Sequence, residues 1–211
     1  MKYFITASLV ILMLNASIAQ TKLGLKLSSS IITQRITQSN DSIAVNNGSN
    51  AFNPAVTLFV DLPLSNTYYF STGIGYISKR ITFEVSGPDI NSTQNKSYNT
   101  QYVQLPASIK LYTNEIALDK KLYFQFGPLI EVAIHTKEND NNMLVIQKMQ
   151  PVDVSLLFAT GIEIQLAPQT SMQIGVNYTR GLINVVSKTA ISADNLVIKN
   201  DLYGIDIAVK F

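Results

Sequence analysis

His135 is the side chain of this sequence best suited to acid–base chemistry, and it is the single histidine among 211 residues. A hydrolase or acyltransferase built on His135 would need a nucleophile and an orienting partner beside it. Serines are plentiful, but no Gly-x-Ser-x-Gly elbow accompanies them. We therefore expect His135 to belong to a polar network, and we predict no catalytic residue.

The sequence contains few side chains with the type and spacing needed to bind a metal ion or a cofactor. Glu138 and Asp140, with the asparagines around them, offer oxygen ligands for Ca²⁺, but their spacing does not match an EF-hand loop and its glycine is missing. The absence of cysteine excludes disulfides, thiolate metal sites, a cysteine nucleophile and a lipoprotein anchor. Glycine-rich phosphate loops are also missing. The sequence thus predicts no metal site, no cofactor site and no enzyme.

The composition is typical of a chain that meets lipid. Apolar residues make up 46% of the chain and charged residues only 14%, against roughly 25% in soluble domains. The net charge is +2, and basic residues do not cluster on one face, so we expect no nucleic-acid partner.

Residues 1–19 have the pattern of a secretory signal peptide. Lys2 gives the positive start, residues 4–14 form a short apolar stretch, and residues 17–19 form a small-x-small cleavage site. We expect one domain over residues 20–211 after cleavage. That domain has no apolar run of 18 residues, so any membrane span in it must consist of strands.

Alternation with a period of two dominates the rest of the chain and predicts β-strands. In the last segment, Ile205 and Ile207 share an apolar face, while Asp206 and Lys210 share the opposite face. Asp153 and Ser155 lie on the corresponding small or charged face of another segment. The same reading predicts strands over residues 22–31, 53–62, 68–81, 101–112, 121–135, 153–166, 171–184 and 202–211.

The connections between these segments alternate in length. Short ones span residues 63–67, 113–120 and 167–170, and long polar ones span residues 32–52, 82–100, 136–152 and 185–201. Short turns at one end and long loops at the other are typical of outer-membrane barrels. The fold class we predict is all-β: a closed antiparallel eight-stranded transmembrane β-barrel, an up-and-down meander that follows a cleaved signal peptide.

Bulk and charge predict which face meets lipid. Phe, Tyr, Ile and Leu gather on one face, and glycine and other small residues on the other, which suits a cramped interior. Charges within the strands fall on the small-residue face: Lys26, Lys110, Lys210, Asp61, Glu131, Glu163 and Asp206. Buried charges persist when paired, so we predict a salt-bridged interior without an open pore. We also expect Lys26 to meet Asp206 across the seam between the first and last strands.

Aromatic residues near the segment ends predict two girdles at the headgroup levels. The residues assigned to them are Tyr68, Tyr69, Phe70, Tyr112, Tyr123 and Phe211 at the short-turn end, and Tyr76, Phe83, Tyr102, Tyr178 and Tyr203 at the long-loop end.

Four short segments have the pattern of a known family: residues 102–110 (YVQLPASIK), 126–128 (FGP), 159–163 (ATGIE) and 177–184 (NYTRGLIN). On these segments the chain resembles the PorT-like outer-membrane β-barrel family of Gram-negative bacteria. Pro106 and Pro128 match the family although they interrupt strands, and we expect bulges or ladder breaks there. Phe211 looks like the terminal signal that the barrel-assembly machinery recognises in its clients.

The expected role follows from this fold and resemblance. We expect an integral outer-membrane protein that contacts outer-membrane lipids and serves binding, adhesion, or envelope or secretion-system assembly through its long loops. Two alternatives stay open at this point: a soluble secreted or periplasmic lipocalin-like barrel with a small apolar ligand, and an outer-membrane lipid-modifying enzyme.

Overall fold

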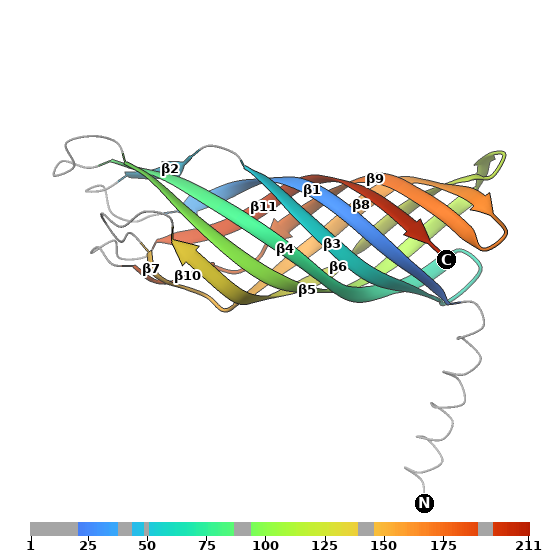
Figure 1. Cartoon of the computed structure of the whole chain (residues 1–211), viewed down its shortest axis with the longest axis horizontal. Helices are drawn as coiled ribbons and strands as arrows, with labels where there is room; N and C mark the ends of the chain where they lie inside the picture. The colour runs from blue at the N-terminus through green and yellow to red at the C-terminus, as the bar shows by residue number, and fades with distance from the viewer. Residues whose placement is uncertain (1–20, 38–43, 49–50, 87–93, 139–145, 190–195) are drawn as a thin grey trace, which may run out of the picture.

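Eight long antiparallel strands close into a barrel in the computed structural model, which describes residues 21–37, 44–48, 51–86, 94–138, 146–189 and 196–211 (Figure 1). Within those ranges, no helix is both long and apolar enough to cross a membrane. The long strands are β1 (Lys22–Thr37), β3 (Phe52–Pro63), β4 (Tyr68–Ser86), β5 (Gln94–Ala117), β6 (Lys120–Glu138), β8 (Val152–Ala167), β9 (Thr170–Gly181) and β11 (Val197–Lys210).

Each long strand pairs with the next one along the chain, so the topology is the predicted up-and-down meander. The seam joins the first and last strands: β1 pairs with β11 in a register that sets Leu27 opposite Ile207. Beyond that ladder, the Phe211 N–H donates to the carbonyl oxygen of Leu23 at 2.7 Å. The C-terminus therefore lies at the end of the barrel that carries the short turns (Figure 1).

The strands extend beyond the predicted bounds at the other end, which we call the long-loop end. β5 starts seven residues before the predicted residue 101, and β4 and β6 also run on, whereas β9 ends at Gly181, before the predicted residue 184. Three short strands also form where only loops were predicted: β2 (Ala44–Asn47), β7 (Ile146–Met149) and β10 (Val186–Thr189). β2 pairs with the projecting part of β4, and β7 pairs with β10. Backbone pairing of this kind needs no alternating side chains, so periodicity did not reveal it.

The two faces of the barrel wall are as predicted. Ile205 and Ile207 are 60% and 51% exposed, whereas Asp206 and Lys210 between and beyond them are 3% and 4% exposed. Apolar side chains thus face outward along β11, and charged side chains face inward.

The predicted aromatic girdles are wrong at five positions. Tyr112 and Tyr123 near the short-turn end, and Phe83 and Tyr102 near the long-loop end, are buried inside the barrel. Tyr69 also faces inward, half-buried, with its ring centroid 5.3 Å from that of Tyr112. These side chains fall on the inward phase of their strands. An eight-stranded barrel must fill its interior with side chains, and small residues alone would leave it hollow. Tyr68, Tyr76, Tyr203 and Phe211 of the predicted girdles are exposed.

Pro106 interrupts the hydrogen-bonded ladder on both sides of β5 without shifting its register. Pairing with β6 stops at Pro106 and resumes at Ile109, and pairing with β4 is interrupted at the same level. This is a ladder break and not a bulge. Gly127 lies opposite the break, where an added Cβ would come within 2.4 Å of the Ser108 Cα. Glycine therefore permits the close approach of β5 and β6 here.

Candidate functional site

Half of the barrel interior, toward the short turns, holds a neutral ion-pair cluster that we call the lower network: Asp61, Lys110, Tyr112, Glu163, Gln173 and Lys210. The Lys110 ammonium lies 3.0 Å from both oxygens of Asp61. The Lys210 ammonium donates to Glu163 at 2.6 Å and lies 3.6 Å from Asp61. Tyr112 and Gln173 also donate to Glu163, at 2.8 and 2.6 Å. These contacts link β3, β5, β8, β9 and β11 across the interior.

A second cluster, the upper network, lies closer to the long-loop end and consists of Lys79, Tyr102, Gln104, Glu131 and Asp153. The Lys79 ammonium donates to Glu131 at 2.5 Å and lies 3.5 Å from Asp153. Gln104 donates to the other Glu131 oxygen at 2.8 Å, and the ammonium sits 4.9 Å from the centre of the Tyr102 ring. All three charged side chains are fully or almost fully buried.

Two interior charges, Lys79 and Asp153, are missing from the predicted set, although Asp153 lies on the face that was predicted to point inward. The signal was present in the period-two pattern. Lys79 continues the period-two spacing of Gly73, Gly75 and Ile77, which face inward on β4. That spacing alone was sufficient to place Lys79 inside the barrel.

The predicted pair at the seam is confirmed. The Lys26 ammonium lies 3.7 Å from the Asp206 carboxylate, and Asn177 donates to the same carboxylate at 2.6 Å. Lys26 and Asp206 come from the first and last strands, so this contact reinforces the line along which the barrel closes.

Apolar side chains fill the interior at the long-loop end. We call this cluster the plug. Phe83 and Ile81 enter from β4, Ile198 from β11, Val185 from the position just before β10, and Val186 from the first position of β10. The other buried members are Ile32, Ile77, Tyr98, Tyr102, Leu196 and Leu202. The plug is therefore built from residues that lie far apart in the sequence.

Together, the networks and the plug leave little room for solvent inside the barrel. One interior cavity of about 50 Å³ lies beside Lys26, Thr57 and Asp206, and another of about 20 Å³ lies beside Phe59 and Lys110. Cavities of this size hold a few water molecules at most. A polar vestibule of about 520 Å³ opens at the short-turn end, and its lining includes Tyr112 and Lys210 of the lower network. The described interior offers no continuous channel.

The structure describes only part of the set of residues weighed for catalysis and metal binding. His135 is exposed near the end of β6, at a level where the register between β5 and β6 shifts, and it belongs to neither of the two interior networks. Asp140 and the asparagines beside it lie outside the described residues. Among the described residues, no group of three His, Cys, Asp or Glu side chains is arranged to hold a metal ion.

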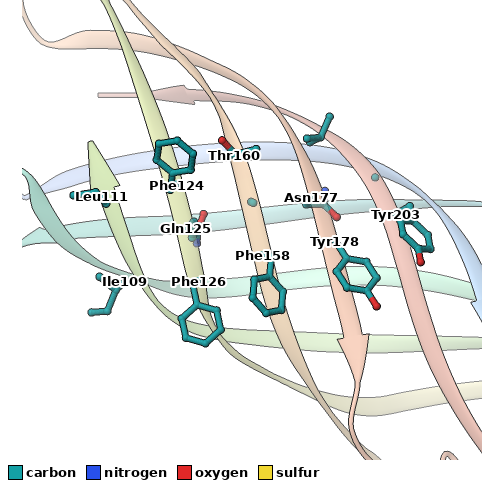
Figure 2. A pocket seen from close by; sticks show the side chains of 13 residues that line it. Ile109, Leu111, Phe124, Gln125, Phe126, Phe158, Thr160, Asn177, Tyr178 and Tyr203 are labelled. Carbon is teal, nitrogen blue, oxygen red and sulfur yellow. The ribbon is translucent and has the colours of Figure 1, made fainter. Parts of the chain in front are cut away.

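The outer wall carries a row of four aromatic rings across adjacent strands: Phe126, Phe158, Tyr178 and Tyr203 (Figure 2). Successive ring centroids are 5.0, 6.2 and 4.9 Å apart. The short side chains of Thr160 and Val176 lie in the adjacent row, and together they line an apolar groove of about 760 Å³ on the outside of the barrel.

Comparisons with known proteins agree with this architecture. A family model described as "Outer membrane protein beta-barrel domain" matches residues 18–187, while a comparison with curated proteins finds no match. The fold is similar to that of Neisserial surface protein A, with 10% identity over 90% of this chain and 95% of that chain and a TM-score of 0.53. It is also similar to the outer membrane protein OprG from Pseudomonas aeruginosa, with the same identity and coverage and a TM-score of 0.56. The barrel is thus an outer-membrane barrel, and the chain belongs to the outer membrane protein β-barrel domain family.

Proposed function

We propose that this protein is a closed outer-membrane barrel that works by binding a partner at its extracellular, long-loop end, and not by conducting solutes. Such binding would suit adhesion, or an accessory role in envelope or protein-secretion assembly. In this proposal, residues 1–19 are removed after export, and the strand that ends in Phe211 is read by the barrel-assembly machinery.

The filled interior is the observation that carries the proposal. Two ion-pair networks and the apolar plug occupy the space that a porin would leave to water, and the interior cavities are only about 50 and 20 Å³. A barrel without a passage can act only through its surfaces.

The projecting strands favour the extracellular end as the working surface. β5 has 24 residues, and β4 and β6 have 19 each. At 3.3 Å per residue and a tilt near 40°, 24 residues rise about 60 Å, more than twice the roughly 25 Å apolar band. Arg80 and Lys137 are exposed near the projecting ends, opposite Asn99 in the two ladders. We call this part of β4, β5 and β6 the projecting sheet.

Conductance across a planar lipid bilayer tests the closed interior. We expect the purified protein to insert without steady channel openings, because the networks and the plug block the axis. Steady openings in most insertions would contradict the proposal.

Photocrosslinking in intact cells tests the binding surface. A photoreactive residue at Arg80 or Lys137 should form a discrete adduct with an envelope component, because both side chains project from the sheet. The same residue at Asn66, which is exposed in the short turn after β3, serves as the control. An identical adduct pattern at all three positions would exclude the projecting sheet as the specific surface.

The two alternatives have separate tests. A soluble lipocalin-like barrel would be released by osmotic shock, whereas we expect extraction only by detergent. A lipid-modifying enzyme would need its histidine, whereas we expect His135→Ala to leave the lipid composition of the envelope unchanged.

A further inference from the structure

The apolar groove lies on the outer wall of β6, β8, β9 and β11 (Figure 2). The row of four aromatic rings forms one side, and Phe124 closes one end of the adjacent row, next to Thr160 and Val176. Thr160 and Val176 have shorter side chains than Phe124 and the rings of the aromatic row, so they form the floor of the groove. Its volume of about 760 Å³ is within the range of about 300–1,000 Å³ that is usual for sites that hold small organic molecules.

The end of the groove at Tyr203 lies below the outer boundary of the membrane. Phe211, in the predicted girdle at the short-turn end, marks the inner boundary of the apolar band. Tyr203 lies eight positions before Phe211, which corresponds to a rise of about 20 Å at 3.3 Å per residue and 40° of tilt. Asp201 lies two positions beyond Tyr203 toward the long-loop end, at a rise of about 25 Å from Phe211. This rise equals the height of the apolar band. Side chains at and above Asp201 therefore lie at the level of lipid headgroups.

Four outward-facing charges occupy that level. Arg180 lies opposite Asp201, and Lys199 lies opposite Arg35 in the adjoining ladder. Arg35 holds Asp201 with two hydrogen bonds of 2.8 and 3.1 Å and also donates to the carbonyl oxygen of Gly181 at 2.6 Å. The one carboxylate of this group is thus already paired.

Within the described ranges, Arg180 and Lys199 have no such partner. Of the carboxylates in the described part of the chain, none lies within ion-pair distance of either side chain. The four charges leave a net charge of +2 directly above the groove. The Tyr178 hydroxyl, 3.4 Å from Asp201, links this charged group to the aromatic row.

We propose that this part of the wall binds one phosphate-bearing lipid of the surrounding leaflet. The phosphate lies against Arg180 and Lys199, and one acyl chain follows the groove along the aromatic row. Arginine and lysine side chains bind phosphate through charge-assisted hydrogen bonds, and each basic residue near an anionic lipid surface strengthens binding to it. The inference concerns the lipid-facing wall and does not depend on the function of the projecting sheet.

The preference of this site for an anionic over a neutral lipid can be measured with spin-labelled lipids, in vesicles that contain the folded protein. We use labelled phosphatidylglycerol as the anionic probe and labelled phosphatidylcholine as the neutral one. We expect the wild type to prefer the anionic probe, and Arg180→Gln/Lys199→Gln to lower that preference about tenfold or more. Lys120→Gln/Lys121→Gln, which neutralises two exposed lysines at the short-turn end, is the matched control and should change the preference much less.

The groove has its own matched pair of variants. Val176→Phe fills the floor, and Ile207→Phe adds the same kind of ring at a similarly exposed position on β11 outside the groove. Both side chains face outward, so neither change alters the interior. We expect only Val176→Phe to weaken retention of the anionic probe, by several-fold. Heat-modifiable migration on gels confirms that each variant is folded.

Two results would overturn the proposal. Equal preferences in the wild type and in Arg180→Gln/Lys199→Gln would show that these cations do not select a lipid. Loss of preference in that variant without any effect of Val176→Phe would reduce the site to a charged surface, and the groove would have no part in it.

Discussion

The lower and upper networks both hold lysine against carboxylates inside the barrel, but they differ in how completely the charges are matched. The lower network sets Lys110 and Lys210 against Asp61 and Glu163. The upper network has Lys79 alone against two carboxylates, and both oxygens of Asp153 lack a hydrogen-bond partner among the described residues. The lower network is therefore redundant, whereas the upper network depends on one cation.

Loss of that cation should have the largest effect. Lys79→Met leaves two buried carboxylates without a counter-charge, and removing one partner of a buried ion pair costs about 3–5 kcal/mol. We expect a decrease of this size in the free energy of unfolding, measured by urea titration in lipid vesicles.

The control for Lys79→Met is Lys137→Met, which removes an exposed lysine near the same end of the barrel. It should change the free energy of unfolding by less than about 0.5 kcal/mol. Equal stability of the two variants would contradict the dependence of the upper network on Lys79.

The matching change in the lower network should cost less. After Lys110→Met, Asp61 still has the Lys210 ammonium 3.6 Å away, so one buried charge keeps a partner. We expect a loss of about 1.5–3 kcal/mol, the range for hydrogen bonds to charged groups, in the same urea titration. A loss as large as that of Lys79→Met would remove the contrast between the networks.

Asp153→Asn should have the smallest effect. The substitution removes the carboxylate that accepts no hydrogen bond and leaves Lys79 paired with Glu131. We expect the free energy of unfolding to change by less than about 1 kcal/mol, because no satisfied hydrogen bond is lost. The double variant Lys79→Met/Asp153→Asn should also be more stable than Lys79→Met. If the double variant is no more stable than Lys79→Met, the Asp153 carboxylate does not destabilise the upper network by repulsion. That result would contradict the charge imbalance inferred from the geometry.

Much of the fold was predictable from the sequence because each long strand separates two environments. The alternation of Ile205 and Ile207 with Asp206 fixes the two faces of β11, and the same pattern on the other strands gives their number and order. The Lys26–Asp206 pair could be predicted because the first and last strands must meet when the barrel closes.

The plug and the short strands could not be predicted in this way. Val185 and Val186 reach the plug from a connection after β9, and their position depends on pairing between β7 and β10. Such contacts join distant segments, so no local period encodes them. The buried tyrosines were misplaced for another reason: an aromatic residue near a strand end suits both a headgroup level and a barrel interior, and only its phase separates the two.

The central claim is that lipid covers the bulky face of the wall while the opposite face is enclosed. The chain contains no Trp, so one introduced Trp reports its own surroundings. Phe158→Trp places it on the outer wall, and Phe59→Trp makes the same change at a buried interior position. In vesicles of brominated lipid, we predict strong quenching of Trp fluorescence in Phe158→Trp and weak quenching in Phe59→Trp. Stronger quenching in Phe59→Trp would show that the faces are reversed and would contradict the account.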